Sequence, residues 1–411
     1  MIVKKIIKNV AWLLMERSGK ILASIFIGGI LARQLGVEGY GQFQYAISVV
    51  LLFASLGLIC GGEVIVPRLA QMPATVTMKI MGDAFSLRFG FAIFAYFGMM
   101  GCAFFTQGVN SQSLLIGILG LTVFFTEPFG VIIAWQQSRA QSKSTALIAL
   151  CAVMVKLAFI LFLYELDLRS KLLFAALWLL ESILVAVGLL VIYRRQNERF
   201  FFGWSLNGIV PLFKAGLPFW FGLIAMYVFM RMDRLLLKEY KGVAELGIYS
   251  AVMQISENMT MVASAIAAVA APLLIYNEED ERKLRKNVLK LAIGMFAVGL
   301  FGALTGTLMA PWIIKTLFGG EFAPAASMLG YSLFAATIVF VEAALNTFLL
   351  KRFGGRKILF KWTVAMLISL AVDLWAIPRW GGYGAIMGFA SGYLTAVTLG
   401  CYWLFGTKAV N

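Results

Sequence analysis

The chain has 411 residues, of which 61% are hydrophobic and only 13% are charged, and its formal net charge is +15. Soluble domains carry roughly 25% charged residues, so this composition argues against a soluble protein. In a membrane protein, the positive charge does not indicate a nucleic-acid partner. Histidine is absent and the four cysteines have no motif spacing. We therefore expect no catalytic residues, no metal and no cofactor.

Apolar stretches follow one another along almost the whole chain, separated by short gaps. Each is roughly 20 residues or longer, which is enough to cross about 30 Å of hydrocarbon as a helix. They are expected at residues 10–33, 41–66, 83–105, 113–135, 145–164, 172–193, 212–234, 247–275, 288–314, 325–350, 359–377 and 383–405. The sequence predicts an all-α polytopic membrane protein with about 12 transmembrane helices.

The gaps alternate between rich and poor in lysine and arginine. Every second gap, beginning with the N-terminal segment, together holds 22 of the 35 basic residues, and the opposite set holds 8. Basic residues near helix ends are retained on the cytoplasmic side of the membrane. This pattern predicts an even number of spans, with both termini in the cytoplasm.

The connection after the sixth span divides the chain into two halves, residues 1–200 and 201–411, each expected to form a six-helix bundle. A faint internal repeat supports this division: Gly36–Phe43 aligns with Gly242–Tyr249 at an offset of 206, with identical glycines at 36/242 and 41/247. Six spans per half give both halves the same orientation, as in transporters built from parallel repeats. We expect a two-lobed transporter with a central cavity.

Basic residues lie inside or at the ends of predicted spans, where a charge is costly and therefore tends to face water or a partner. One interpretation is a cationic cavity for an anionic ligand such as pyrophosphate, because guanidinium groups bind phosphate oxygens with two hydrogen bonds. The alternatives are side chains that reach the headgroups and structural ion pairs between helices. The candidates are Arg17, Lys20, Arg88, Lys156, Arg231 and Arg234.

Two acidic residues are candidates for coupling or gating. Asp233 lies between Arg231 and Arg234, and we expect it to form an ion pair with them that closes an outer gate; a proton-coupling site is the alternative. Glu127 precedes Pro128, a residue that kinks or ends helices. Other embedded acids, such as Glu181, Glu342 and Asp373, are interpreted as structural.

Four segments carry a resemblance to a known family, in order along nearly the whole chain. They are Leu31–Ser48, Leu217–Pro218 with Asp233–Leu237 and Gly247–Ala251, Leu317–Phe322, and Pro378–Ala385. Together they resemble the O-antigen and polysaccharide flippases (Wzx type) of the multidrug/oligosaccharidyl-lipid/polysaccharide (MOP) exporter superfamily.

The resemblance implies two six-helix bundles around a cavity that opens alternately to either side of the bacterial cytoplasmic (inner) membrane. It implies as cargo an undecaprenyl-pyrophosphate-linked oligosaccharide, such as the O-antigen repeat unit of lipopolysaccharide, with membrane lipids and other polysaccharide assembly proteins as partners. In the family, cationic residues of the cavity bind the pyrophosphate and aromatic residues bind the sugar. A drug or ion antiporter of the MATE type is the nearest alternative, and a membrane polysaccharide polymerase is a more distant one.

Overall fold

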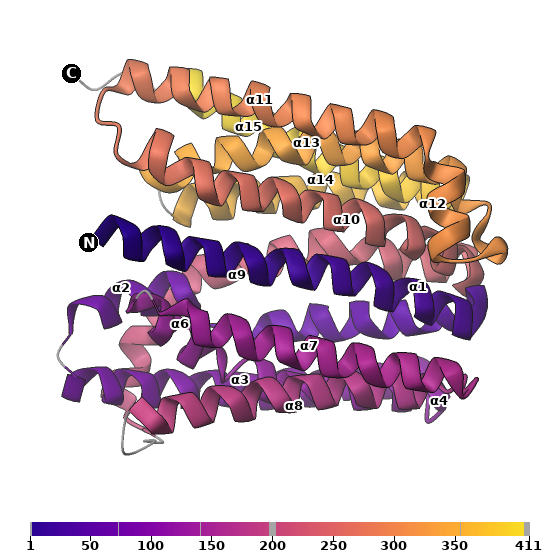
Figure 1. Ribbon diagram of the computed structural model, residues 1–411, viewed down its shortest axis with the longest axis horizontal. Helices are drawn as coiled ribbons and strands as arrows, with labels where there is room; N and C mark the ends of the chain where they lie inside the picture. Colours follow the sequence, from indigo (N-terminus) through magenta and orange to yellow (C-terminus); the bar gives the residue numbers. More distant parts are fainter. Residues whose placement is uncertain (1, 73, 140, 197–202, 354, 407–411) are drawn as a thin grey trace. The chain divides into compact units, whose positions relative to one another are not determined.

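The chain is almost entirely helical in the computed structural model, which describes residues 2–72, 74–139, 141–196, 203–353 and 355–406 (Figure 1). The helices are α1 (Ile2–Gly57), α2 (Gly62–Gln71), α3 (Ala74–Gln107), α4 (Ser111–Gly120), α5 (Thr122–Thr126), α6 (Gly130–Ser138), α7 (Ser142–Glu165), α8 (Lys171–Gln196), α9 (Leu206–Lys241), α10 (Val243–Ala271), η1 (Pro272–Tyr276), α11 (Glu281–Leu308), α12 (Ala310–Leu317), η2 (Gly320–Phe322), α13 (Ala325–Arg352), α14 (Gly355–Trp380) and α15 (Gly382–Gly406).

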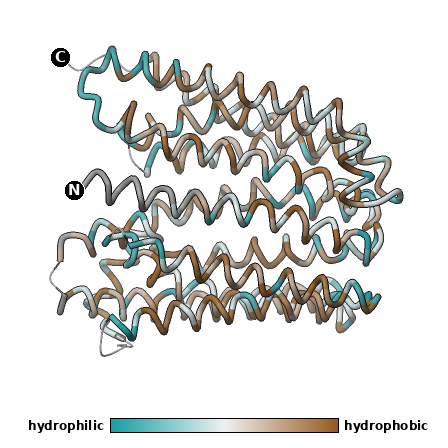
Figure 2. Tube along the Cα trace, in the orientation of Figure 1, coloured by the Kyte–Doolittle hydropathy of each residue, from teal (hydrophilic) through white to brown (hydrophobic). Residues whose placement is uncertain are grey.

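The predicted polytopic architecture is confirmed. Eleven helical stretches of the described residues are long and apolar enough to cross a membrane, and the first of them, Ser18–Ala70, is 53 residues long. At 1.5 Å per residue that stretch measures about 80 Å, far more than one crossing, so it contains two of the predicted spans. Figure 2 shows the reason for the pattern: hydrophobic residues occupy the long middle parts of the helices, and hydrophilic residues gather near many of their ends.

The chain folds into two compact units, each made from two segments of the sequence. Unit 1 consists of Met1–Ala23 and Ala46–Tyr227, and unit 2 of Ser24–Tyr45 and Val228–Asn411. Both α1 and α9 therefore contribute to both units. The predicted boundary between two six-helix bundles, near residue 200, lies outside the described residues and stays a prediction.

Unit 1 is built around pairs of neighbouring helices. α7 packs along α8, as Figure 1 shows, while α2 packs on α6 and α4 packs on both α3 and α8. Its core includes Trp135 and Tyr193, both fully buried, whose rings meet edge to face with centroids 5.1 Å apart. Aromatic pairs in this geometry stabilise a core beyond the area they bury.

Two spans of unit 1 are broken, and the breaks lie at glycine and proline residues. α1 ends at Gly57 and the next helix, α2, begins only at Gly62. Between them Cys60 has a positive φ of 59°. The span of α4, α5 and α6 is interrupted at Leu121 and again at residues 127–129, which include Pro128. Proline removes a backbone donor and crowds the preceding turn, so it breaks the helix at this point.

Unit 2 is built around α13, α14 and α15. α14 packs along α15, and α13 packs against α10, α11 and α15. Phe340, Phe348 and Trp403 are buried among smaller aliphatic residues at the centre of this unit.

The sequence repeat corresponds to a symmetric contact within unit 2. Gly36 (φ 66°, ψ −179°) breaks α1, and Gly242 (φ 87°, ψ 177°) precedes α10 with nearly the same backbone conformation, which side chains other than glycine rarely adopt. Five residues later, a Cβ on Gly41 would lie 2.2 Å from the Val243 carbonyl oxygen, and a Cβ on Gly247 would lie 2.1 Å from the Val37 carbonyl oxygen. The two copies of the repeat thus pack on each other reciprocally, and glycine is required in both.

Candidate functional site

Arg88 on α3 joins the two broken spans of unit 1. Its Nη2 donates to Glu127 Oε2 at 3.0 Å, and its Nε donates to the carbonyl oxygen of Gly57, the last residue of α1, at 3.3 Å. Arg88 is 5% exposed. A buried arginine that binds a carboxylate and caps the C-terminal end of a helix is electrostatically satisfied. Glu127, one of the two groups that accept a hydrogen bond from Arg88, is itself a predicted gate or coupling residue.

Lys156 on α7 is likewise held by one acid. Its Nζ lies 2.5 Å from Glu181 Oε2 on α8 and 4.1 Å from the centre of the Trp178 ring, which adds a cation–π contact. Lys156 is buried. The pair therefore bridges two helices that pack along each other in unit 1.

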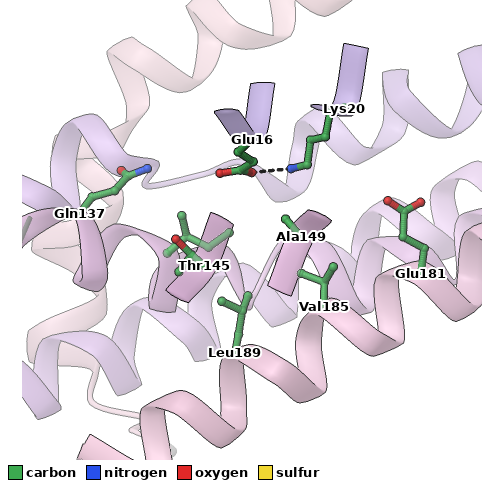
Figure 3. A pocket seen from close by; sticks show the side chains of 9 residues that line it. Glu16, Lys20, Gln137, Thr145, Ala149, Glu181, Val185 and Leu189 are labelled. Atoms are coloured by element: carbon green, nitrogen blue, oxygen red, sulfur yellow. Dashed lines mark hydrogen bonds and ion pairs between the residues drawn. The ribbon is translucent and has the colours of Figure 1, made fainter. Parts of the chain in front are cut away.

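Lys20 and Glu16, one helical turn apart on α1, form the third pair of unit 1, with Nζ and Oε1 2.6 Å apart. They line a cavity of about 230 Å³ between α1, α6, α7 and α8, which Figure 3 shows from close by. The remaining lining residues are Ile133, Gln137, Thr145, Ala149, Glu181, Val185 and Leu189. The side chain of Arg17, a further predicted cation of this helix, lies outside the described part of the structure.

Unit 2 holds a different arrangement, in which two arginines share one acid. On α9, Arg231 and Arg234 are three residues apart and therefore lie on the same face. Both bind Glu257 on α10: Arg231 Nη1 lies 3.3 Å and Arg234 Nη2 2.7 Å from the same oxygen, Oε1. Arg231 Nη2 reaches the second carboxylate oxygen at 3.4 Å.

The arginine cluster of unit 2, made of Arg231, Arg234 and Glu257, carries one positive charge more than it neutralises. Arg234 is only 2% exposed. Among the described residues, the buried Nε atoms of Arg231 and Arg234 and Nη1 of Arg234 have no hydrogen-bond partner. Unpaired buried donors on charged groups are costly, so this cluster favours an anionic ligand.

Among the described residues, Asp233 forms hydrogen bonds and no ion pair with the neighbouring arginines, and its role as a gate stays a prediction. The Asp233 carboxylate accepts hydrogen bonds from the Tyr249 hydroxyl and from the backbone N–H of Arg234, the latter at 2.7 Å. Residues one or two positions apart on a helix point in different directions. The arginine side chains consequently reach Glu257, and Asp233 points toward α10 from another face of α9.

Sequence reasoning missed a further buried pair. Lys361, which is not among the predicted candidates, lies on α14, fully buried, with Nζ 2.5 Å from Glu342 Oε1 and 2.7 Å from Asn346 Oδ1. Glu342 and Asn346 are four apart on α13, and this spacing was the available signal. Glu257, the ligand of both arginines, was also not singled out as a site residue.

Arg33, which lies in one of the resemblance motifs, anchors helix ends within unit 2. Its guanidinium donates to the carbonyl oxygens of Thr316 at 2.5 Å and Leu317 at 3.1 Å, at the end of α12. A cation at a helix C-terminus satisfies carbonyl groups that have no partner within the helix. This contact assigns Arg33 a structural role.

A family model described as polysaccharide biosynthesis protein matches residues 30–327, which is more than half of the chain. A search of curated proteins finds no match. Solved structures give close likenesses of fold at low sequence identity. One is the lipid II flippase MurJ in an inward closed conformation, with a TM-score of 0.77 and 10% identity, covering 97% of this chain and 87% of that one.

Two further structures belong to transporters of the MOP superfamily. An inward-facing multidrug resistance transporter of the MATE family has a TM-score of 0.71 and 14% identity, covering 95% of this chain and 93% of that one. A MOP transporter from Pyrococcus furiosus, described as having a binding pocket of reversed polarity, has a TM-score of 0.65 and 15% identity, covering 98% and 94%. At these identities the likeness establishes the fold, which is that of the MOP transporters.

Proposed function

We propose that this chain, which belongs to the polysaccharide biosynthesis protein family, is a flippase for an undecaprenyl-pyrophosphate-linked oligosaccharide such as an O-antigen repeat unit. It is a polytopic membrane transporter with a MOP-type fold. In the proposal it acts in the bacterial inner membrane, with both termini in the cytoplasm, and moves its cargo to the outer leaflet by alternating access. Other polysaccharide assembly proteins would supply the cargo and take it over.

The observation that carries the proposal is the arginine cluster of unit 2. Two guanidinium groups share the single carboxylate of Glu257, and three of their buried nitrogens have no partner in the described residues. A pyrophosphate offers several charged oxygens at the spacing that guanidinium groups bind best. In the proposal, the pyrophosphate of the cargo neutralises this excess charge and occupies the free donors of Arg231 and Arg234.

The same cluster argues against the drug antiporter alternative. A site for cationic drugs requires an apolar or acidic lining, because the excess positive charge of this cluster repels a positively charged ligand. The MATE-type structures share the fold with this chain, but fold alone does not select the cargo. The family match to polysaccharide biosynthesis and the positive cluster favour the lipid-linked anion.

Asp233 and Glu127 are proposed to stabilise helix packings that alternate during the transport cycle. Asp233 joins α9 to α10 through the Tyr249 hydroxyl, and Glu127 joins the break between α5 and α6 to α3 through Arg88. Alternating access requires helices that exchange one packing for another. Contacts that bridge two helices at a break or near the end of a helix are suited to stabilise one of those packings.

The experiment that tests the function is deletion of this chain in its source strain, followed by analysis of the two membrane leaflets. The proposal predicts that lipid-linked oligosaccharide accumulates on the cytoplasmic face and that surface polysaccharide disappears. Plasmid-borne wild-type chain should restore both. If the lipid-linked intermediate is distributed between the leaflets as in the parent strain, the proposed function is wrong.

A further inference from the structure

We propose that the cavity of unit 1 holds one neutral sugar ring of the cargo and so contributes to the choice of oligosaccharide. This inference rests on the proposed flippase function and adds a subsite for the part of the cargo that the arginine cluster does not recognise.

The cavity is formed by matching faces of four helices (Figure 3). Each helix contributes residues spaced by four, so that their side chains point the same way. These sets are Glu16 and Lys20 on α1, Ile133 and Gln137 on α6, Thr145 and Ala149 on α7, and Glu181, Val185 and Leu189 on α8. Side chains carried on helices are positioned more precisely than side chains on loops, as a specificity subsite requires.

The charge of the lining excludes a small ion as the preferred occupant. Glu16 is neutralised by Lys20 at 2.6 Å, and Glu181 by Lys156 at 2.5 Å. Two carboxylates repel a pyrophosphate, while the two lysines cancel the attraction that the carboxylates would exert on a cation. The net charge of the site is zero, and a neutral ligand fits it best.

The polarity of the lining suits a ligand with one polar edge and one apolar face. Glu16, Lys20, Gln137 and Glu181 offer polar groups, and the Thr145 hydroxyl, which donates to the Ser142 carbonyl oxygen at 2.9 Å, keeps its oxygen as an acceptor. Among the described residues the Gln137 amide makes no hydrogen bond. Ile133, Ala149, Val185 and Leu189 add an aliphatic lining. A sugar ring combines hydroxyl groups at its edge with C–H groups on its face, so a lining that is partly polar and partly aliphatic suits it.

The size of the cavity limits the occupant to one ring. Sites for drug-sized ligands measure roughly 300–1,000 Å³, whereas a single buried water needs only about 10–15 Å³. The cavity measures about 230 Å³. It is therefore large for ordered water and small for a whole repeat unit, and a monosaccharide lies between these limits.

The test separates the sugar from the lipid pyrophosphate. Full-length chain in lipid nanodiscs is titrated with two probes: undecaprenyl pyrophosphate, and the undecaprenyl-pyrophosphate-linked oligosaccharide extracted from the source strain lacking this chain. We expect the double variant Gln137→Leu/Thr145→Val to bind the sugar-bearing lipid about tenfold more weakly, the effect of losing two ordinary hydrogen bonds. Its affinity for the bare lipid should be unchanged.

Two further variants secure the interpretation. Thr106→Val makes the same chemical change as Thr145→Val, at a hydroxyl that donates to the Cys102 carbonyl oxygen and lies outside the cavity, so it should bind both lipids as wild type does. Gln137→Leu alone removes no side-chain hydrogen bond found in the described part of the chain and keeps the test valid if the double variant is unstable. Equal weakening of both lipids, or of neither, overturns the sugar subsite, whereas a wild-type chain that binds neither lipid overturns the proposed function as well.

Discussion

The two units treat buried charge in different ways. In unit 1, the buried cations Arg88 and Lys156 each have an acid of their own, Glu127 and Glu181, and the more exposed Lys20 has Glu16. In unit 2, Lys361 and Glu342 follow the same rule, but Arg231 and Arg234 share Glu257. The difference teaches that a charge inside a membrane span does not by itself indicate a ligand. The balance between the charge and its partners decides which kind of ligand, if any, fits.

The balance also decides what happens when one residue is removed. Taking one partner from a one-to-one pair leaves a buried, uncompensated charge, which costs about 3–5 kcal/mol of stability. Taking one arginine from the arginine cluster leaves Glu257 with the other arginine, so the remaining charges are balanced. Removing one partner of a pair in unit 1 should therefore lower stability, whereas removing one arginine of the cluster in unit 2 should lower transport and leave stability unchanged.

The largest effect is expected for the double substitution Arg231→Ala/Arg234→Ala. It removes the charge-assisted hydrogen bonds proposed for the pyrophosphate, each worth about 1.5–3 kcal/mol, so export should fall by at least about 100-fold. Surface polysaccharide in the complemented deletion strain measures export, and immunoblotting of membranes measures abundance. The single variant Arg231→Lys should keep partial activity, because a point charge replaces a fork.

The single variant Arg231→Ala is the critical control for that experiment. It keeps the Arg234–Glu257 pair, so its thermal midpoint in detergent should equal that of wild type while its export falls. Wild-type export by Arg231→Ala at normal abundance would show that the excess charge of the cluster has no part in cargo binding.

The next largest effect is expected on stability in unit 1. Arg88→Ala leaves Glu127 unpaired and the Gly57 carbonyl without its donor, and should destabilise the protein by about 3–5 kcal/mol. Thermal unfolding of purified protein, followed by tryptophan fluorescence, detects the change. The double variant Arg88→Ala/Glu127→Ala should recover a large part of it, because no uncompensated charge remains. A stable Arg88→Ala protein that fails to export would place Arg88 in the cargo site and remove the distinction between the units.

The smallest effect concerns Asp233. Tyr249→Phe removes one hydrogen bond to its carboxylate, and Asp233→Asn keeps an oxygen that accepts the N–H of Arg234. We expect each to reduce export by less than about tenfold, through a less stable closed state and without loss of pyrophosphate binding. A double-mutant cycle of the two changes measures their coupling, which should be about 1 kcal/mol. Complete loss of export by Asp233→Asn alone would contradict this expectation, because it would show that Asp233 is essential to the transport cycle.

Hydropathy and charge predicted the helices of this chain because both signals are local. Nearly every predicted span corresponds to a helix or a broken helix within a few residues, including the short break at Gly36 that separates the first two spans. The repeat predicted from Gly36/Gly242 and Gly41/Gly247 has a structural basis, since those glycines have the same uncommon backbone or the same close contact.

Partners of the buried charges were harder to predict, because they depend on which helices pack together. The sequence places Arg231 and Arg234, three residues apart, on one helix face, and Glu16 and Lys20, four apart, on another. It could not indicate that Glu257 lies opposite both arginines, or that Lys361 is buried against α13 and not exposed in a gap. Asp233 forms no ion pair with Arg231 or Arg234 among the described residues for a local reason: residues next to each other on a helix do not share a face.

The most direct test of the central claim is the affinity of purified chain for undecaprenyl pyrophosphate in nanodiscs, compared between two neutralised variants. One is Arg231→Ala, in the arginine cluster of unit 2, and the other is Arg88→Ala/Glu127→Ala, in a balanced pair of unit 1. We predict that Arg231→Ala weakens binding at least about tenfold, as expected for one lost charge-assisted contact, while the unit 1 double variant binds like wild type. Equal affinities for all three proteins, or a larger loss in the unit 1 variant, would contradict the account.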